Sequence, residues 1–121
     1  MTRRHRGRMS HFAGAAAEVR IATDYERRGF PVAARRWRGE GGEIDLVLRD
    51  GAGVIFVEVK QSRDFDSAAA SLSARQILRL QNAAEEYVGT LPGGSLTDMR
   101  FDVALVNGRG EFHLIENALA A

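Results

Sequence analysis

Two acids and a lysine are spaced on successive apolar runs so that they meet across a predicted hairpin. Strict alternation places Ile44, Leu46 and Leu48 on one face of the first run and Glu43, Asp45, Val47 and Arg49 on the other. The turn between the runs, residues 50–53, contains two glycines that can supply the positive φ of a tight hairpin. If the first and last turn residues oppose each other, the antiparallel register places Asp45 opposite Glu58. The same register places Glu43 opposite Lys60.

The pairing of Asp45 with Glu58 would be unfavourable in a hairpin with a purely structural role. Opposed side chains have Cβ atoms roughly 4.5–5.5 Å apart, and two carboxylates about 5 Å apart repel by about 3 kcal/mol at an effective dielectric constant near 20. A divalent cation between them converts this repulsion into binding, because hard cations take several carboxylate and carbonyl oxygens. The alternative is that the strand ends are exposed and the charges solvated. Apolar residues on both sides of Asp45 and Glu58 favour a pocket, so we expect a metal site.

Length and composition indicate one domain without thiol chemistry. The chain has 121 residues, of which 45% are hydrophobic and 27% charged, and it has no cysteine. This length supports one core, and the missing thiols exclude disulfides and favour a reducing compartment. No stretch is long and apolar enough to span a bilayer, and the Arg-rich N-terminus lacks the apolar centre of a signal peptide. We expect a cytoplasmic protein that does not bind membranes.

The net charge is only +1, but the arginines are clustered in two segments. Their candidate phosphate-binding members are Arg3, Arg4, Arg6, Arg8, Arg36 and Arg38. A guanidinium offers a fixed fork of donors to phosphate, so both clusters predict contact with nucleic acid. The alternatives are a solubilising flexible tail over residues 1–10 and a solvated strand edge at the second cluster.

The pattern of the whole chain predicts an α/β domain. The expected elements are a helix over residues 13–28, strands over 32–37, 43–50 and 54–61, a polar loop over 62–71, a helix that begins at a capping box on Ser73, a turn region over 90–98, and strands over 101–106 and 111–115. The order α-β-β-β-α-β-β predicts a mixed central sheet flanked by helices. Residues 1–10 are expected to be a basic flexible tail and residues 11–121 the domain.

The first expected helix carries a third acid on its apolar side. Glu18 lies near the middle of a stripe formed by Ala15, Val19, Ile21, Ala22 and Tyr25. A lone buried acid costs several kcal/mol unless something pairs with it. Either Glu18 forms a salt bridge with an arginine such as Arg36 or Arg38, or it points across the core towards the Asp45–Glu58 pair.

Several motifs resemble those of the small bacterial YraN-type family. They are Gly14-x-x-Ala17-Glu18, residues 27–30, residues 36–38, Gly42-Glu43-Ile44-Asp45-Leu46, Phe56-Val57-Glu58-Val59-Lys60, residues 100–103 and residues 115–118. The similarity extends from about His11 to Leu119. That family resembles a minimal member of the restriction-endonuclease-like superfamily, which includes archaeal Holliday junction resolvases. The resemblance implies a single restriction-endonuclease-like domain with an acid on its first helix, an Asp on one strand and Glu-x-Lys on the next.

The resemblance also implies roles for individual residues. The catalytic residues would be Asp45, Glu58, Lys60 and Glu18, with Glu43 supporting them; Mg²⁺ or Mn²⁺ would be held by Asp45, Glu58, Glu18 and the Val59 carbonyl. Lys60 would orient a water molecule or stabilise developing negative charge. Arg63 lies one position later than the arginine of many relatives, and Arg75 stands where lysine is common; both join the expected nucleic-acid contacts.

The implied reaction is metal-dependent endonucleolytic hydrolysis of DNA, including branched, repair or recombination intermediates. A homodimer is compatible with this implication, because junction resolvases of this fold are dimers. The alternative is a non-catalytic nucleic-acid-binding or adaptor module that kept the fold. Such a module would usually lose Lys60 or one of the acids, and this chain retains all of them.

Overall fold

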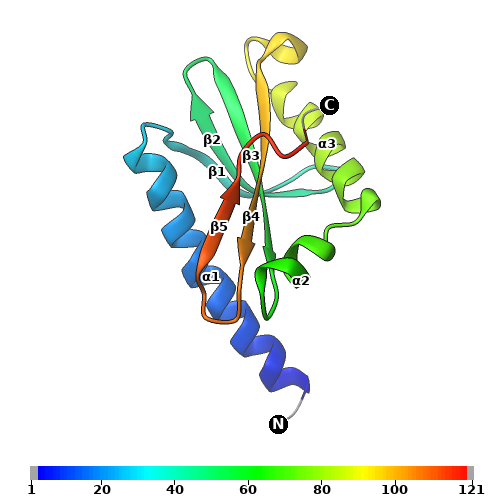
Figure 1. The fold of residues 1–121 in the computed structure, drawn as a ribbon. Helices are drawn as coiled ribbons and strands as arrows, with labels where there is room; N and C mark the ends of the chain where they lie inside the picture. Colours follow the sequence, from blue (N-terminus) through cyan, green and yellow to red (C-terminus); the bar gives the residue numbers. More distant parts are fainter. Residues whose placement is uncertain (1–2, 120–121) are drawn as a thin grey trace.

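The computed structural model describes residues 3–119, with side chains described from residue 15 onward (Figure 1). Its elements are α1 (Arg3–Arg27), β1 (Val32–Arg38), β2 (Glu43–Asp50), β3 (Gly53–Gln61), α2 (Phe65–Ala70), α3 (Ala74–Val88), a 3₁₀ turn η1 (Gly94–Leu96), β4 (Met99–Val106) and β5 (Phe112–Ile115). The expected α/β order is confirmed, with α2 as one addition. Within residues 3–119, no helix is both long and apolar enough to cross a bilayer.

The five strands form one mixed sheet in the order β1-β2-β3-β4-β5. Pairing is antiparallel from β1 to β3 and between β4 and β5, whereas β3 and β4 are parallel. A parallel pair needs a long crossover, and α2, α3 and η1 supply it. Figure 1 shows α1 on one side of the sheet and α2 with α3 on the other. The sheet is therefore the middle of three layers.

Both faces of the sheet are buried by helices. On the α1 side the buried residues are Ala17, Ile21, Ala22, Tyr25, Leu46, Leu48, Ile55, Val57, Ala104 and Val106. On the α3 side they are Ile44, Val47, Val54, Phe56, Leu80, Ala83, Ala84 and Val88, and a small group under α2 is Ala68, Val103 and Leu105. Burial of a strand on both faces explains why β2 and β3 read as nearly continuous apolar runs.

Helix α1 differs from expectation in its start and in one side chain. It begins at Arg3, ten residues before the expected start, so the helix backbone continues through most of the segment expected as a tail. Val19, expected on the apolar stripe, is 58% exposed, and Ala17 is buried in its place. The helix therefore meets the sheet along a narrower stripe than the hydrophobic residues alone suggest.

The expected polar loop over residues 62–71 contains the short helix α2. Asp64 caps it by accepting a hydrogen bond from the Ser67 amide, and Phe65 and Ala68 pack beside β4. Six residues of mixed Ser, Asp and Ala give little periodic signal, which is why the sequence pattern missed it. The capping box at Ser73 is confirmed, since its side chain and that of Gln76 bond each other's amides.

Candidate active site

The predicted register of the β2–β3 hairpin is confirmed, and it ends at the candidate site. Asp50 pairs with Gly53, and regular pairing continues as far as Leu46 with Val57. The next position on each strand is Asp45 and Glu58. The Asp45 Oδ2 atom accepts a hydrogen bond of 2.8 Å from the Val59 amide. The Asp45 carboxylate thus binds a backbone N–H of β3 just beyond the last pair of the ladder, and it is turned towards β3.

The alternation of β2 changes at Asp45. Leu46 and Leu48 pack on the α1 side, as predicted, but Ile44 packs with Val47 on the α3 side. Two residues three positions apart cannot share a face in a regular strand. The expectation that Ile44, Leu46 and Leu48 share one face is therefore wrong, and the change of face falls between Ile44 and Leu46.

Strand β1 shows the matching irregularity. The register shifts between Val32 and Ala34, and Ala33, Ala34 and Trp37 all pack on the α3 side, so the alternation is not regular from Ala34 to Trp37 either. Between them Arg36 has φ of +48°, in the left-handed region that non-glycine residues seldom occupy. Its neighbours pair as Arg35 with Leu46 and Trp37 with Ile44, which places Arg36 across from Asp45. The side-chain alternation of β1 and β2 therefore changes at the same level of the sheet, at Arg36 and Asp45. Neither of these two residues lies in the core on either face of the sheet.

The loop that leads into β2 is held against α3. The Glu86 carboxylate accepts hydrogen bonds of 2.9 Å and 2.8 Å from the backbone amides of Glu40 and Gly41. A Cβ atom on Gly42 would lie 3.1 Å from the Arg79 carbonyl oxygen, so a glycine suits the close approach there. Helix α3 thereby sets where β2 begins, and with it the position of Asp45.

The acids at this point have perturbed acidities. Burial raises the pKa of Asp45, and the charges on Glu18 and Glu43 raise it further, while the bond from the Val59 amide opposes the shift. Burial also raises the pKa of Glu58, to about 8, with the charge on Asp45 as the next cause. Burial disfavours the charged form and a neighbouring like charge adds to it. The two carboxylates are therefore close enough to act on each other, as the register predicted.

Lys60 completes this group. Its Nζ atom lies 3.8 Å from Glu58 Oε1, and the two side chains are 16% and 17% exposed. The charge on Lys60 opposes the rise in the pKa of Glu58. Lys60 is also the only lysine in the chain, since every other side chain counted with it is an arginine. An ammonium is a compact charge with three rotatable donors, and a guanidinium does not replace it.

Two further acids flank the pair, and each is bound by a β1 arginine. Glu18 is 25% exposed and its Oε2 atom lies 3.3 Å from Arg36 Nη2, which confirms one of the two readings of this helix acid. Glu43 Oε2 lies 3.1 Å from Arg38 Nη2. Among the side chains described, no three Asp, Glu or His residues are arranged to hold one metal ion. As the side chains lie, Glu18 is thus not gathered with the pair.

The donor set fits a hard divalent cation. Asp45 and Glu58 supply carboxylate oxygens, which Mg²⁺ and Mn²⁺ prefer, and burial together with neighbouring negative charge raises the pKa of both acids although Lys60 lies beside Glu58. Val59 is half-buried beside them, and the role of its carbonyl stays a prediction.

The arginines expected to contact nucleic acid come from several elements. Arg36 and Arg38 lie on the edge strand β1, and Arg75 is exposed at the start of α3. Arg63 follows β3, is 86% exposed and lies 3.4 Å from Asp64. The side chains of Arg3, Arg4, Arg6 and Arg8 lie outside the described residues.

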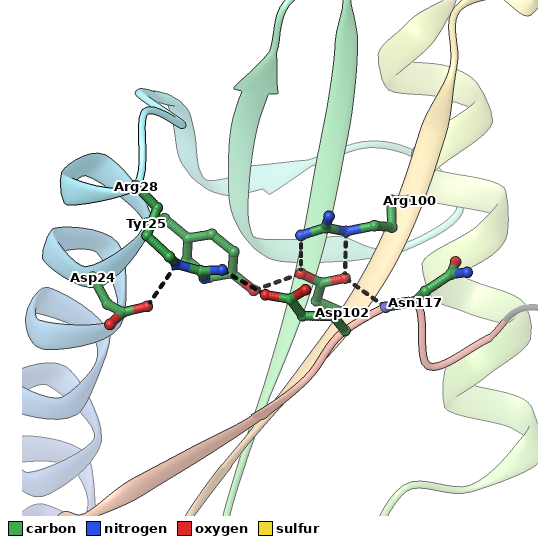
Figure 2. A network of polar contacts seen from close by, with 7 residues as sticks. Asp24, Tyr25, Arg28, Arg100, Asp102 and Asn117 are labelled. Atoms are coloured by element: carbon green, nitrogen blue, oxygen red, sulfur yellow. Dashed lines mark hydrogen bonds and ion pairs between the residues drawn. The ribbon is translucent and has the colours of Figure 1, made fainter.

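A second buried acid, Asp102 on β4, was not predicted as a site residue. Figure 2 shows its carboxylate between α1, β4 and the C-terminal segment. It accepts one hydrogen bond from the Tyr25 hydroxyl (2.7 Å), two from the Arg100 guanidinium (2.9 Å each) and one from the backbone N–H of Asn117 (2.9 Å). Its signal in the sequence is the same as that of Asp45, an acid inside an apolar strand. Tyr25 lies two turns from Glu18, so this network fixes the helix that carries Glu18.

A groove of about 590 Å³ lies at the turn end of the β2–β3 hairpin, with Tyr87, Leu91 and Leu96 among its lining residues. None of the expected site residues lines it. The candidate site therefore lies outside this groove.

Comparisons with known proteins identify the family. The model of "Uncharacterised protein family UPF0102" matches residues 17–106, which include Glu18, Asp45, Glu58 and Lys60. A UPF0102 protein of Ruegeria pomeroyi is 58% identical over 93% of this chain and 92% of its own length. Others from Cereibacter sphaeroides and Roseobacter denitrificans are 56% and 50% identical, over 95% and 96% of this chain and 98% and 90% of their own lengths. The chain belongs to the UPF0102 family.

Proposed function

We propose that the protein is a metal-dependent endonuclease that hydrolyses phosphodiester bonds in DNA. The observation that carries this proposal is the convergence of Asp45, Glu58 and Lys60 where the β2–β3 ladder ends. Two partly buried carboxylates with raised pKa values lie beside one partly buried ammonium group. Perturbed acids of this kind cluster at functional sites, whereas a structural pair would be expected to have compensating donors.

The residues fit the needs of phosphodiester hydrolysis. Asp45 and Glu58 would hold Mg²⁺ or Mn²⁺, which when bound supplies charge neutralisation at the phosphate and lowers the pKa of a water molecule. Lys60 lies 3.8 Å from Glu58, at the edge of the pair, where its ammonium can orient the attacking water or stabilise the negative charge that develops on the phosphate. The arginines of β1 would hold the polyanion, since guanidinium groups bind phosphate in a fork geometry.

The resemblance to restriction-endonuclease-like nucleases supports the same proposal. Asp45 lies on β2, whereas Glu58 and Lys60 lie on β3, and the hairpin brings the three residues together. Members of that superfamily act on DNA, and some resolve branched junctions. We therefore include branched repair and recombination intermediates among the proposed substrates.

The decisive experiment separates binding from cleavage. Single-stranded, duplex and four-way-junction DNA are incubated with Mg²⁺ or Mn²⁺ and with the wild type, Lys60→Ala, Lys60→Arg or Glu58→Gln. Removing one group that acts on the transition state costs about 10²–10³ in rate, so cleavage should fall by at least this factor in every variant. Binding in Ca²⁺, measured by fluorescence anisotropy, should survive in the lysine variants.

Arg49→Ala is a suitable control, because Arg49 is exposed and lies at the end of β2 far from the site. This variant should cleave DNA like the wild type. Equal activity in the wild type and Lys60→Ala would reveal a contaminating nuclease. If the wild type binds DNA but cuts no member of the panel with either metal, the protein is a nucleic-acid-binding or adaptor module instead.

A further inference from the structure

Arg36 and Glu18 form an ion pair beside the proposed cation site, and the inference drawn from it rests on the proposed function. The pair joins strand β1 to helix α1 at 3.3 Å. Arg36 is 51% exposed, while Glu18 is mostly covered. One end of the pair therefore faces solvent, where a ligand can reach it, and the other end lies close enough to Asp45 for its charge to act there.

The backbone of Arg36 adopts an unusual conformation that accompanies this contact. A non-glycine residue with φ of +48° occupies a sparsely populated region, and such residues persist only where the surroundings hold them. Arg36 lies across from Asp45 in the β1–β2 register. Its side chain nevertheless reaches Glu18 on the helix. The strand thus departs from regular geometry at the residue that binds the third acid.

The two possible partners of Glu18 exclude each other. In the described structure the carboxylate is bound by Arg36, and no three acids are gathered to hold one cation. A DNA phosphate competes with Glu18 for the exposed guanidinium of Arg36. The observed contact joins only one nitrogen to one oxygen, whereas a phosphate can bind two nitrogens and its binding releases counterions. A phosphate on Arg36 would leave Glu18 without its cation and next to Asp45.

We propose that Arg36 is a positioning residue that couples DNA binding to cation binding. In the free protein its ion pair occupies the Glu18 carboxylate, and a phosphate that binds Arg36 releases Glu18 to become the third carboxylate of the cation site. By thermodynamic reciprocity, DNA then raises the affinity for the cation by the factor by which the cation raises the affinity for DNA. The complete site is assembled only when substrate is bound.

The test measures Mn²⁺ binding rather than activity. Mn²⁺ is titrated into the full chain and followed by electron paramagnetic resonance, with and without a phosphorothioate duplex that resists cleavage; Mn²⁺ bound by duplex alone is subtracted. In the wild type the duplex should tighten Mn²⁺ binding about tenfold, within the usual range of such couplings. Arg36→Gly should bind Mn²⁺ more tightly without DNA and show no further gain with it. Glycine accepts the positive φ, so this variant should fold.

Two controls separate this role from a general charge effect. Arg49→Ala removes an exposed arginine that is not among the expected phosphate contacts and should keep the wild-type coupling. A double-mutant cycle adds Arg36→Gly to a Glu18→Gln background, where it should no longer change Mn²⁺ affinity, because Arg36 acts through Glu18. If Arg36→Gly tightens Mn²⁺ binding equally in both backgrounds, only net charge is at work and the inference is overturned. Arg36→Asn, which also tolerates this φ, provides a second variant.

The outcomes distinguish this inference from the proposed function. If Mn²⁺ binding does not depend on Glu58, as judged by Glu58→Gln, the cation site itself is wrong and the inference falls with it. If Mn²⁺ binding depends on Glu58 but the duplex leaves its affinity unchanged in the wild type, the cation site stands and the role of Arg36 is overturned.

Discussion

Asp102 and the Asp45–Glu58 pair are two acidic sites in the interior of the molecule, and they differ in how many hydrogen-bond donors the protein supplies to them. Asp102 is fully buried, and its two oxygens accept four hydrogen bonds from Tyr25, Arg100 and Asn117. Asp45 accepts one hydrogen bond from a backbone amide, Glu58 has the ammonium of Lys60 at 3.8 Å, and otherwise, within the described residues, the two acids have only each other as partners. Donors of the protein itself satisfy Asp102, whereas Asp45 and Glu58 repel each other when both are charged.

The acidities show the same contrast. Burial raises the pKa of Tyr25, and its hydrogen bond to Asp102 adds to the rise, which keeps the hydroxyl protonated as a donor. Bonding to Asp102 raises the pKa of Arg100, so both partners stay in the form that the acid needs. At Asp45 and Glu58 the acids themselves have raised pKa values. A buried acid with a complete set of donors stabilises the fold, and a buried pair without one has free capacity for a ligand.

The largest effect is expected at the satisfied acid. Asp102→Ala leaves the Tyr25 hydroxyl and the Arg100 guanidinium without their acceptor, and breaking a buried pair costs about 3–5 kcal/mol. Because the Arg100 side chain is 26% exposed, we expect a loss of about 3 kcal/mol in urea unfolding followed by circular dichroism. Asp24→Ala, which removes an exposed partner of Arg28, should cost about 0–1 kcal/mol. Equal losses in the two variants would contradict a structural role for the network.

A smaller effect is expected at Glu58 in the absence of metal, where the free energy of unfolding should fall as pH rises. Its pKa is about 8 in the folded state and about 4.3 when unfolded. The folded state binds the proton more tightly, so this contribution to stability is complete below about pH 4.3 and is lost as pH rises through about 8. The free energy of unfolding in EDTA should fall by about 2–3 kcal/mol between pH 6 and 9. Glu58→Gln should remove this fall, and an identical pH profile in both proteins would show that Glu58 ionises normally.

The smallest stability change is expected at Asp45. Asp45→Asn can still accept the bond from the Val59 amide but removes one charge of the pair, so without metal it should be more stable than the wild type, by about 1 kcal/mol or less at pH 7. Millimolar Mg²⁺ should raise the melting temperature of the wild type, because a ligand that binds only the folded state stabilises it. The variant should lose most of that shift. A wild-type melting curve that does not respond to millimolar Mg²⁺ or Mn²⁺ would rule out the cation site.

Much of the fold and the centre of the site follow from local patterns in the sequence. The two-residue period of β2 and β3 and the glycine-containing turn determine the hairpin register, and this register makes Asp45 and Glu58 the next residues after its last pair, Leu46 with Val57. The Ser73–Gln76 capping box determines where α3 begins. Each of these features depends on residues close to one another in the chain, so a single sequence is sufficient to predict them.

The tertiary structure alone decided the features that depend on long-range partners. Nothing in the sequence marks Arg36 as the residue with positive φ, because arginine has no preference for that conformation and the surrounding packing imposes it. The choice of Arg36 rather than Arg38 as the partner of Glu18 depends on how α1 lies against β1. The four bonds to Asp102 likewise join α1, β4 and the C-terminal segment, which are far apart in the chain. Local periodicity carries no information about such contacts, because they are determined only when the helices pack against the sheet.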